Sequence, residues 1–180
     1  MTDAALAVPA SAPSDEVAIQ IRGMNKWYGT FHVLRDIDLT VHRGERIVIC
    51  GPSGSGKSTL IRHVNRLIDP TAGEITINGE DVLAMTPEAL RTFRRTRIAM
   101  VFQKFALLPH RSVIDNVAYG LEIRGVPKAK RREEAAKWIE IVGLKGYEDT
   151  RPRQMSGGQQ QRVGLARALA MDTDIILMDE

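Results

Sequence analysis

The chain has 180 residues, of which 43% are apolar, with 25 Lys plus Arg against 22 Asp plus Glu and a single cysteine. This length and composition predict a globular domain, and the net charge of +3 is too small for a disordered protein. The longest uncharged stretch, between Asp3 and Asp15, contains two prolines and falls well short of the roughly 18 to 20 apolar residues that span a bilayer. The N-terminus lacks a secretory pattern and one cysteine excludes an internal disulfide, so we expect a cytoplasmic protein.

The charge pattern gives little support for a nucleic-acid partner, although the sequence pI is near 9.2. Basic clusters at 91–97 and 128–132 are typical of exposed helical surfaces, and the second runs directly into two glutamates. The four histidines show no metal-ligand spacing. We therefore expect no nucleic-acid partner and no histidine-based metal site.

The first half of the chain predicts a flexible tail followed by strands and one helix. Residues 1–16 are rich in Ala, Pro and Ser and have no apolar period, which predicts the tail. Alternating or continuous apolar residues predict strands over 17–22, 37–42 and 47–50. Helical spacing begins at Ser58 and ends before Pro70. The arrangement around Gly51 is therefore strand, glycine-rich loop and helix.

The second half alternates between short strands and helices. Asn78-Gly79 predicts a tight turn after a strand, Thr86 with Pro87 predicts a helix start, and Ser112 with Asp115 predicts a capping box. The expected strands are 75–77, 98–102 and 175–178, and the expected helices follow Thr86, run from Ser112 to about 123, cover 129–142 and include 165–171. This alternation predicts an α/β fold with a parallel central sheet.

The stretch Gly51-Pro52-Ser53-Gly54-Ser55-Gly56-Lys57-Ser58 fits the phosphate-binding pattern G-x-x-x-x-G-K-[ST]. Its glycines let backbone amides point at phosphate oxygens, Lys57 reaches the β- and γ-phosphates, and Ser58 can ligate Mg²⁺. Thr59 adds a further hydroxyl. The alternative is a glycine-rich turn without a ligand, and the pattern does not fit the dinucleotide-binding G-x-G-x-x-G.

Two carboxylates, Asp179 and Glu180, close the buried apolar strand at 175–178. Beside a phosphate loop, Asp179 would hold Mg²⁺ and Glu180 would orient or deprotonate the attacking water. The alternative is a charged turn at the strand end.

A second anion site is one of two interpretations of residues 155–162. Ser156, Gly157, Gly158 and Gln159 begin a helix with a hydroxyl and exposed amides. A serine-capped flexible loop explains the same residues, and the residues alone leave this choice open.

Together these motifs, over about residues 17–180, resemble the ATP-binding subunit of ATP-binding cassette (ABC) transporters. In this resemblance Tyr28 corresponds to the aromatic that stacks on adenine, 51–59 to the Walker A loop, and Gln103 to the Q-loop glutamine. Residues 156–159 resemble the signature, preceded here by Met155 instead of the usual Leu, and 175–180 resemble Walker B.

The resemblance implies a P-loop ABC ATPase core with an N-terminal antiparallel part, and a helical subdomain at about 104–158. It implies binding of ATP and Mg²⁺, with Ser58, Gln103 and Asp179 as Mg²⁺ ligands and Glu180 and Gln103 as catalytic residues. It also implies a head-to-tail dimer in which Ser156, Gly157, Gly158 and Gln159 cover the partner's ATP. The resemblance implies that the chain lies at the cytoplasmic face of the cell membrane, bound peripherally to permease subunits. These subunits would receive the solute from a solute-binding protein.

Two importer groups share the resemblance. Residues 24–29 and 45–49 resemble ATPases of polar amino-acid importers, whereas 65–68, 98–103 and 163–170 resemble those of glycine betaine/proline importers. We therefore expect an importer of compatible solutes, with polar amino acids second.

The resemblance further implies about 50 to 80 residues after position 180. We expect a chain truncated after Walker B to hydrolyse ATP poorly and to expose a sheet edge that favours aggregation. Three alternatives stay open: a nucleotide-binding fragment without turnover, a soluble non-transport ABC ATPase, and a small-molecule kinase, which would leave Ser156 to Gln159 without a role.

Overall fold

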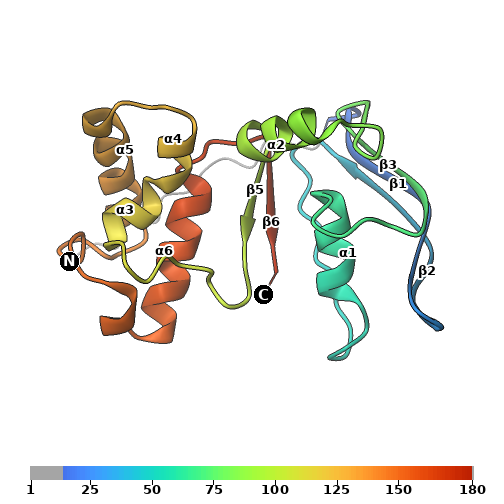
Figure 1. Ribbon diagram of the computed structural model, residues 1–180, viewed down its shortest axis with the longest axis horizontal. Helices are drawn as coiled ribbons and strands as arrows, with labels where there is room; N and C mark the ends of the chain where they lie inside the picture. The colour runs from blue at the N-terminus through green and yellow to red at the C-terminus, as the bar shows by residue number, and fades with distance from the viewer. Residues whose placement is uncertain (1–13, 180) are drawn as a thin grey trace. The chain divides into compact units, whose positions relative to one another are not determined.

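The structure, a computed structural model, describes residues 14–179. The chain divides into two compact units, Met1–Met85 and Thr86–Glu180, and each is described by itself (Figure 1). Most of the predicted tail lies outside the described residues. In its described part, residues 14–16, the backbone N–H of Ser14 donates to the carbonyl of Arg43, and the carbonyl of Glu16 accepts from the N–H of Arg43.

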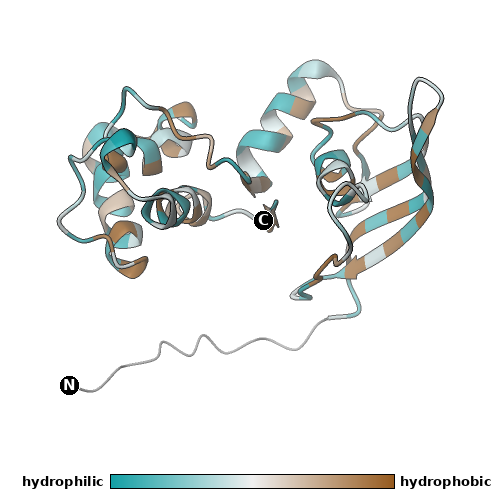
Figure 2. Cartoon of the chain, turned by 90° about the horizontal axis from the view of Figure 1, so that it is seen from below, coloured by the Kyte–Doolittle hydropathy of each residue, from teal (hydrophilic) through white to brown (hydrophobic). Residues whose placement is uncertain are grey.

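The first unit is built on a four-stranded antiparallel sheet with the order β2-β1-β3-β4. Its strands are β1 (Val17–Tyr28), β2 (Phe31–His42), β3 (Ala72–Ile77) and β4 (Glu80–Asp81). Alternate side chains such as Ile19 and Ile21 are buried, and Figure 2 shows the matching bands of hydropathy along the strands. The Asn78-Gly79 turn is confirmed, with both residues at positive φ.

The strand β1 continues six residues beyond the predicted end at Arg22. The apolar alternation breaks at Gly23, which adopts a φ of 52°, and the pairing register with β2 shifts between Ile21 and Met24. Met24 is fully buried after this shift. A β-bulge therefore hides the continuation of the strand from a strict two-residue period.

The predicted strand at 47–50 is wrong. These residues belong to no strand, and Ile47 and Val48 are 43% and 82% exposed. A strand forms by hydrogen bonding to a neighbour, and none of the described strands pairs with this segment. The helix expected after the loop is present as α1 (Lys57–Val64), but it ends at Val64 and not just before Pro70, and Arg66 has a φ of 51°.

The second unit combines a parallel strand pair with helices. Its elements are α2 (Pro87–Thr96), β5 (Ile98–Val101), α3 (Val113–Val117), α4 (Tyr119–Ile123), α5 (Lys128–Ile141), the 3-10 helix η1 (Pro152–Gln154), α6 (Gly157–Leu169) and β6 (Ile175–Met178). β5 and β6 pair in parallel, from Ile98 opposite Ile175 to Val101 opposite Met178. In the described residues, the expected parallel sheet thus consists of this one pair.

The predicted N-caps at Thr86 and Ser112 are confirmed, but the second does not form the expected reciprocal capping box, because the carboxylate of Asp115 accepts from the hydroxyl of Ser112. The hydroxyl of Thr86 accepts from the N–H of Ala89, and that of Ser112 accepts from the N–H of Asp115. The helix expected to continue from Ser112 to about 123 is instead divided at Ala118 into α3 and α4.

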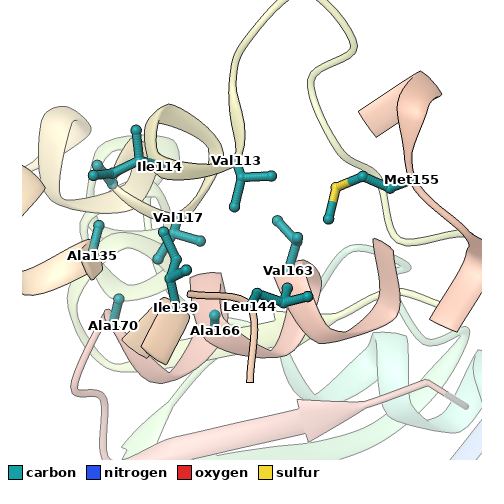
Figure 3. Packing of buried hydrophobic residues seen from close by; sticks show 11 residues of the cluster. Val113, Ile114, Val117, Ala135, Ile139, Leu144, Met155, Val163, Ala166 and Ala170 are labelled. Atoms are coloured by element: carbon teal, nitrogen blue, oxygen red, sulfur yellow. The ribbon is translucent and has the colours of Figure 1, made fainter. Parts of the chain in front are cut away.

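The main apolar cluster of the second unit joins α3, α5 and α6. Figure 3 shows these side chains pointing toward one another, and Val113, Val117, Ile139 and Val163 are among those that are fully buried. Burial of each such side chain contributes roughly 1.5 to 3 kcal/mol. The cluster therefore holds α6 in a fixed position.

Among residues 14–179, none of the helices has the length and apolar composition that a membrane-spanning helix needs.

Candidate nucleotide-binding site

The predicted phosphate loop forms a tight turn that leads directly into α1. Gly54 and Gly56 adopt φ values of 80° and 92°, in the left-handed region where a side chain is strained. Gly56 is also the N-cap of α1 and supplies no side-chain cap. The first amides of α1 therefore lack a side-chain cap from that position, and such amides with the helix dipole attract anions.

Lys57, the first residue of α1, places its ammonium beside the loop. Its Nζ donates to the carbonyls of Gly51 and Pro52, at 2.8 Å each. A cation held against this loop is placed to meet phosphate oxygens. Ser58 and Thr59, the next two residues, are half-buried in the first turn of the helix. Ser53 and Ser55 are exposed, and the N–H of Ser55 donates to the carbonyl of Pro52.

The hairpin that carries Tyr28 belongs to the same unit as the loop. Tyr28 is half exposed at the end of β1, and the ammonium of Lys26 lies 5.1 Å from its ring centroid. The next strand, β2, touches the loop, because a Cβ added at Gly56 would lie 2.9 Å from Leu34 Cδ2 and 3.2 Å from Val33 Cγ1. The start of β2 thus abuts the end of the phosphate loop.

A polar network supports this hairpin, and sequence reasoning missed it. The buried side chain of Asn25 donates from Nδ2 to Asp36 Oδ1 at 2.8 Å, and its Oδ1 lies 2.8 Å from His32 Nε2. Because an amide oxygen only accepts, His32 carries its proton on Nε2. The imidazole also stacks on Trp27, with ring centroids 3.7 Å apart. A pattern over neighbouring residues could not predict this network, because His32 and Asp36 are 7 and 11 positions from Asn25.

His63, in the last turn of α1, is fully buried. Its Nδ1 lies 2.5 Å from the carbonyl of Thr59 and donates to it, and Nε2 has no hydrogen-bond partner among the described residues. Burial is the main reason why the pKa of His63 is below its ordinary value of 6.5. The nearby charge of Lys26 lowers it further, while Asp69 acts in the opposite direction. The imidazole is therefore held neutral.

In the second unit, Ser156 is the N-cap of α6. Its hydroxyl accepts from the N–H of Gln159, and Gln159 Oε1 accepts from the N–H of Ser156, which forms a capping box. The serine cap of the alternative interpretation is thus present, but the residues that follow it form the first turn of a helix and not a loop. A Cβ at Gly157 or Gly158 would meet nothing within 4 Å, and neither glycine has a positive φ. Neither packing nor backbone strain within the described residues accounts for these two glycines.

Gln103 and Asp179 follow the paired strands β5 and β6 at the same end. Val101 pairs with Met178, and the N–H of Asp179 donates to the carbonyl of Val101 at 3.0 Å. Asp179 is buried, at 2% exposure, whereas Gln103 is exposed. Ligand-binding groups characteristically lie at the carboxyl ends of parallel strands. Glu180 lies outside the described residues.

The predicted site residues are divided between the two units. Tyr28 and the loop 51–59 belong to the first unit, and Gln103, Asp179 and 156–159 to the second. No group of three His, Cys, Asp or Glu suited to a metal occurs among residues 14–179. The predicted Mg²⁺ ligands Ser58, Gln103 and Asp179 are a different kind of donor set, made entirely of oxygens, which suits a hard cation.

Comparison with known proteins agrees with these motifs. Residues 34–180 match the family described as ABC transporter. The glycine betaine transport ATP-binding protein OpuAA of Bacillus subtilis is 57% identical over 143 residues, which cover 79% of this chain and 34% of OpuAA. The glutamate/glutamine/aspartate/asparagine transport ATP-binding protein BztD of Rhodobacter capsulatus is 50% identical over 168 residues, which cover 93% of this chain and 63% of BztD. The chain thus spans less than two thirds of either relative.

The fold agrees as well. The solved structure of MJ0796, a bacterial ABC transporter cassette in dimeric form, has a TM-score of 0.86 and 35% identity, and the match covers 90% of this chain and 73% of that one. The expected mixed α/β fold of an ABC ATPase, with its antiparallel N-terminal part, is confirmed. Since the family match covers well over half of the chain, the protein belongs to the ABC transporter family through its ATP-binding domain.

Proposed function

We propose that this chain is the ATP-binding and ATP-hydrolysing part of a subunit that energises an ABC importer. The observation that carries the proposal is the loop at 51–56. Two of its glycines have a left-handed backbone conformation, and the loop leads into the start of α1, where the N-cap residue supplies no side-chain hydrogen bond. Such a loop is suited to a triphosphate because amides, the helix dipole and the ammonium of Lys57 all favour negative charge.

In this proposal ATP lies along the first unit. Its β- and γ-phosphates exchange for the carbonyls of Gly51 and Pro52 as partners of Lys57, while the loop amides bind the remaining oxygens. The adenine stacks on Tyr28, which is half exposed at the end of β1. Aromatic stacking is tolerant of the base, so it contributes affinity more than selectivity.

Ser58, Gln103 and Asp179 would hold Mg²⁺, which would neutralise the charge that develops on the phosphates. Asp179 supports this assignment because it is a buried carboxylate at the end of a parallel strand pair. Glu180, the next residue, would orient or deprotonate the attacking water, and Gln103 would position it from the end of β5.

Ser156, Gly157, Gly158 and Gln159 would contact ATP bound to a second copy in a head-to-tail dimer. Their support is the pair of glycines at the start of α6, whose bare backbone leaves space for a phosphate to approach. The solved cassette that this chain resembles is described as dimeric. Closure of the dimer around ATP, and its opening after hydrolysis, would then drive the transporter.

For the transported solute we propose glycine betaine or proline-type compatible solutes first, and polar amino acids second. The relatives named for each solute are 57% and 50% identical to this chain. The partners would be transmembrane permease subunits, which receive the solute from a solute-binding protein. The chain would lie peripherally at the cytoplasmic face of the membrane.

Release of phosphate from Mg-ATP by the purified chain tests the hydrolytic function. We expect slow turnover by the wild-type chain, which Lys57→Ala and Glu180→Gln should each abolish. Lys145→Ala, which changes an exposed lysine of the second unit, should leave this turnover intact. Turnover that survives Lys57→Ala would contradict the proposal. Lys57-dependent ATP binding without turnover would favour the alternative of a nucleotide-binding fragment.

A further inference from the structure

One arginine of α6 grips the backbone that follows Gln103. Arg167 Nη1 donates to the carbonyl of Ala106 at 2.7 Å, and Nη2 donates to the carbonyl of Phe105 at 2.8 Å. The side chain is partly buried, and burial lowers the pKa of its guanidinium without removing the charge. Two charge-assisted hydrogen bonds from one planar group define both the distance and the orientation of the segment they bind.

The backbone that accepts these hydrogen bonds, at Phe105 and Ala106, is in an unfavourable conformation. Phe105 and Ala106 have φ values of 57° and 45°, in the left-handed region that non-glycine residues rarely occupy. Two successive residues of this kind persist only when surrounding contacts hold them. The hydrogen bonds from Arg167 are such contacts, because they end on the carbonyls of these same two residues.

The segment also lies close to α6. A Cβ at Gly164, one turn before Arg167, would lie 3.8 Å from the carbonyl oxygen of Phe105, which is ordinary van der Waals contact. Figure 1 shows the connection from β5 to α3 reaching α6. Since α6 is seated in the main apolar cluster through Val163 and Ala166, it offers the segment a rigid support.

We propose that Arg167 is a positioning residue that holds the backbone of 104–106 against α6 and thereby sets the place of Gln103. This inference rests on the proposed function, in which Gln103 acts on Mg²⁺ and water. Gln103 is two residues from Phe105, and the proposed signature begins the helix that carries Arg167. Arg167 would therefore tie the two proposed nucleotide-contacting segments of the second unit to each other.

The first test uses the chain without nucleotide. In Arg167→Ala, we expect the backbone amides of 104–106 to exchange with solvent at least about tenfold faster, and the side-chain amide signals of Gln103 to shift in nuclear magnetic resonance spectra. Gln103→Ala assigns those signals. Arg162→Ala, an exposed arginine on the same helix, is the matched control and should leave both readouts unchanged. Arg167→Lys, with one compact donor group, should give an intermediate effect.

Unchanged exchange at 104–106 in Arg167→Ala would overturn the proposal, as would an unmoved Gln103 signal. Faster exchange spread evenly over α3, α5 and α6 would also overturn it, because that pattern indicates a general structural role.

The second test measures how much Mg²⁺ strengthens ATP binding. Arg167→Ala should reduce this gain to the same extent as Gln103→Ala, and the double variant should lose no more than either single variant. ATP binding without Mg²⁺ should be unchanged. A full Mg²⁺ gain in Arg167→Ala would overturn the positioning role. If the wild-type chain binds no ATP, the proposed function fails, and the exchange and Gln103 signals still decide the role of Arg167.

Discussion

Replacing Gly56 by alanine tests the contact between the phosphate loop and β2. Gly56 has a φ of 92°, where an L-residue is strained by about 1 to 2 kcal/mol. The new methyl would lie 2.9 Å from Leu34 Cδ2 and 3.2 Å from Val33 Cγ1, and such overpacking typically costs about 1 to 3 kcal/mol. Leu34 is buried, at 4% exposure, so it has little space to move away. We expect a total loss of about 2 to 5 kcal/mol.

Gly54→Ala is the matched control within the same loop. Gly54 also has a positive φ, 80°, but a Cβ there would meet nothing within 4 Å. It should therefore lose only the strain of about 1 to 2 kcal/mol. Urea unfolding followed by circular dichroism measures both free energies of unfolding. Equal losses in the two variants, or a larger loss in Gly54→Ala, would refute the packing of β2 against the loop.

Three further predictions concern α6 and α1. Ser156→Ala removes the cap that Gln159 shares, so it should lower the free energy of unfolding by about 1 kcal/mol in urea titrations; no loss would contradict the capping box. Gly158→Ala meets no steric obstacle and should stabilise the chain by up to about 1 kcal/mol while weakening ATP-dependent dimerisation in analytical ultracentrifugation. Dimerisation as strong as in the wild type would count against the proposed partner contact. Because the pKa of His63 is lowered in the folded chain, its contribution to stability should be complete above pH 6.5 and should be lost as the pH falls below 6.5 toward the folded pKa. Thermal unfolding of wild type and His63→Leu between pH 5 and 7.5 measures this, and equal pH dependence in both would contradict it.

Local signals predicted most of the helices well because their causes are close in sequence. The caps at Thr86 and Ser112 each bond to an amide three positions on, and the turn at Asn78-Gly79 needs only its own two residues. Such interactions are encoded within one turn of chain. The family assignment drew on the same kind of short motif.

Features that depend on distant partners were predicted poorly. The apolar run at 47–50 has the composition of a strand but pairs with none of the described strands. The bulge after Ile21 depends on its partner β2. Arg167 was not singled out because its targets, Phe105 and Ala106, lie 62 and 61 positions away. Sequence spacing contains no information about such contacts until the fold is known.

Calorimetric titration of wild type and Lys57→Ala with Mg-ATP shows whether residues 51–59 bind a nucleotide. We expect saturable binding by the wild-type chain and none by the variant, because the variant lacks the Nζ that lies 2.8 Å from two carbonyls of the loop. Circular dichroism is the control that both proteins are folded. Equal binding by a folded Lys57→Ala, or no binding by a folded, monodisperse wild-type chain, would contradict the claim that residues 51–59 form a nucleotide site.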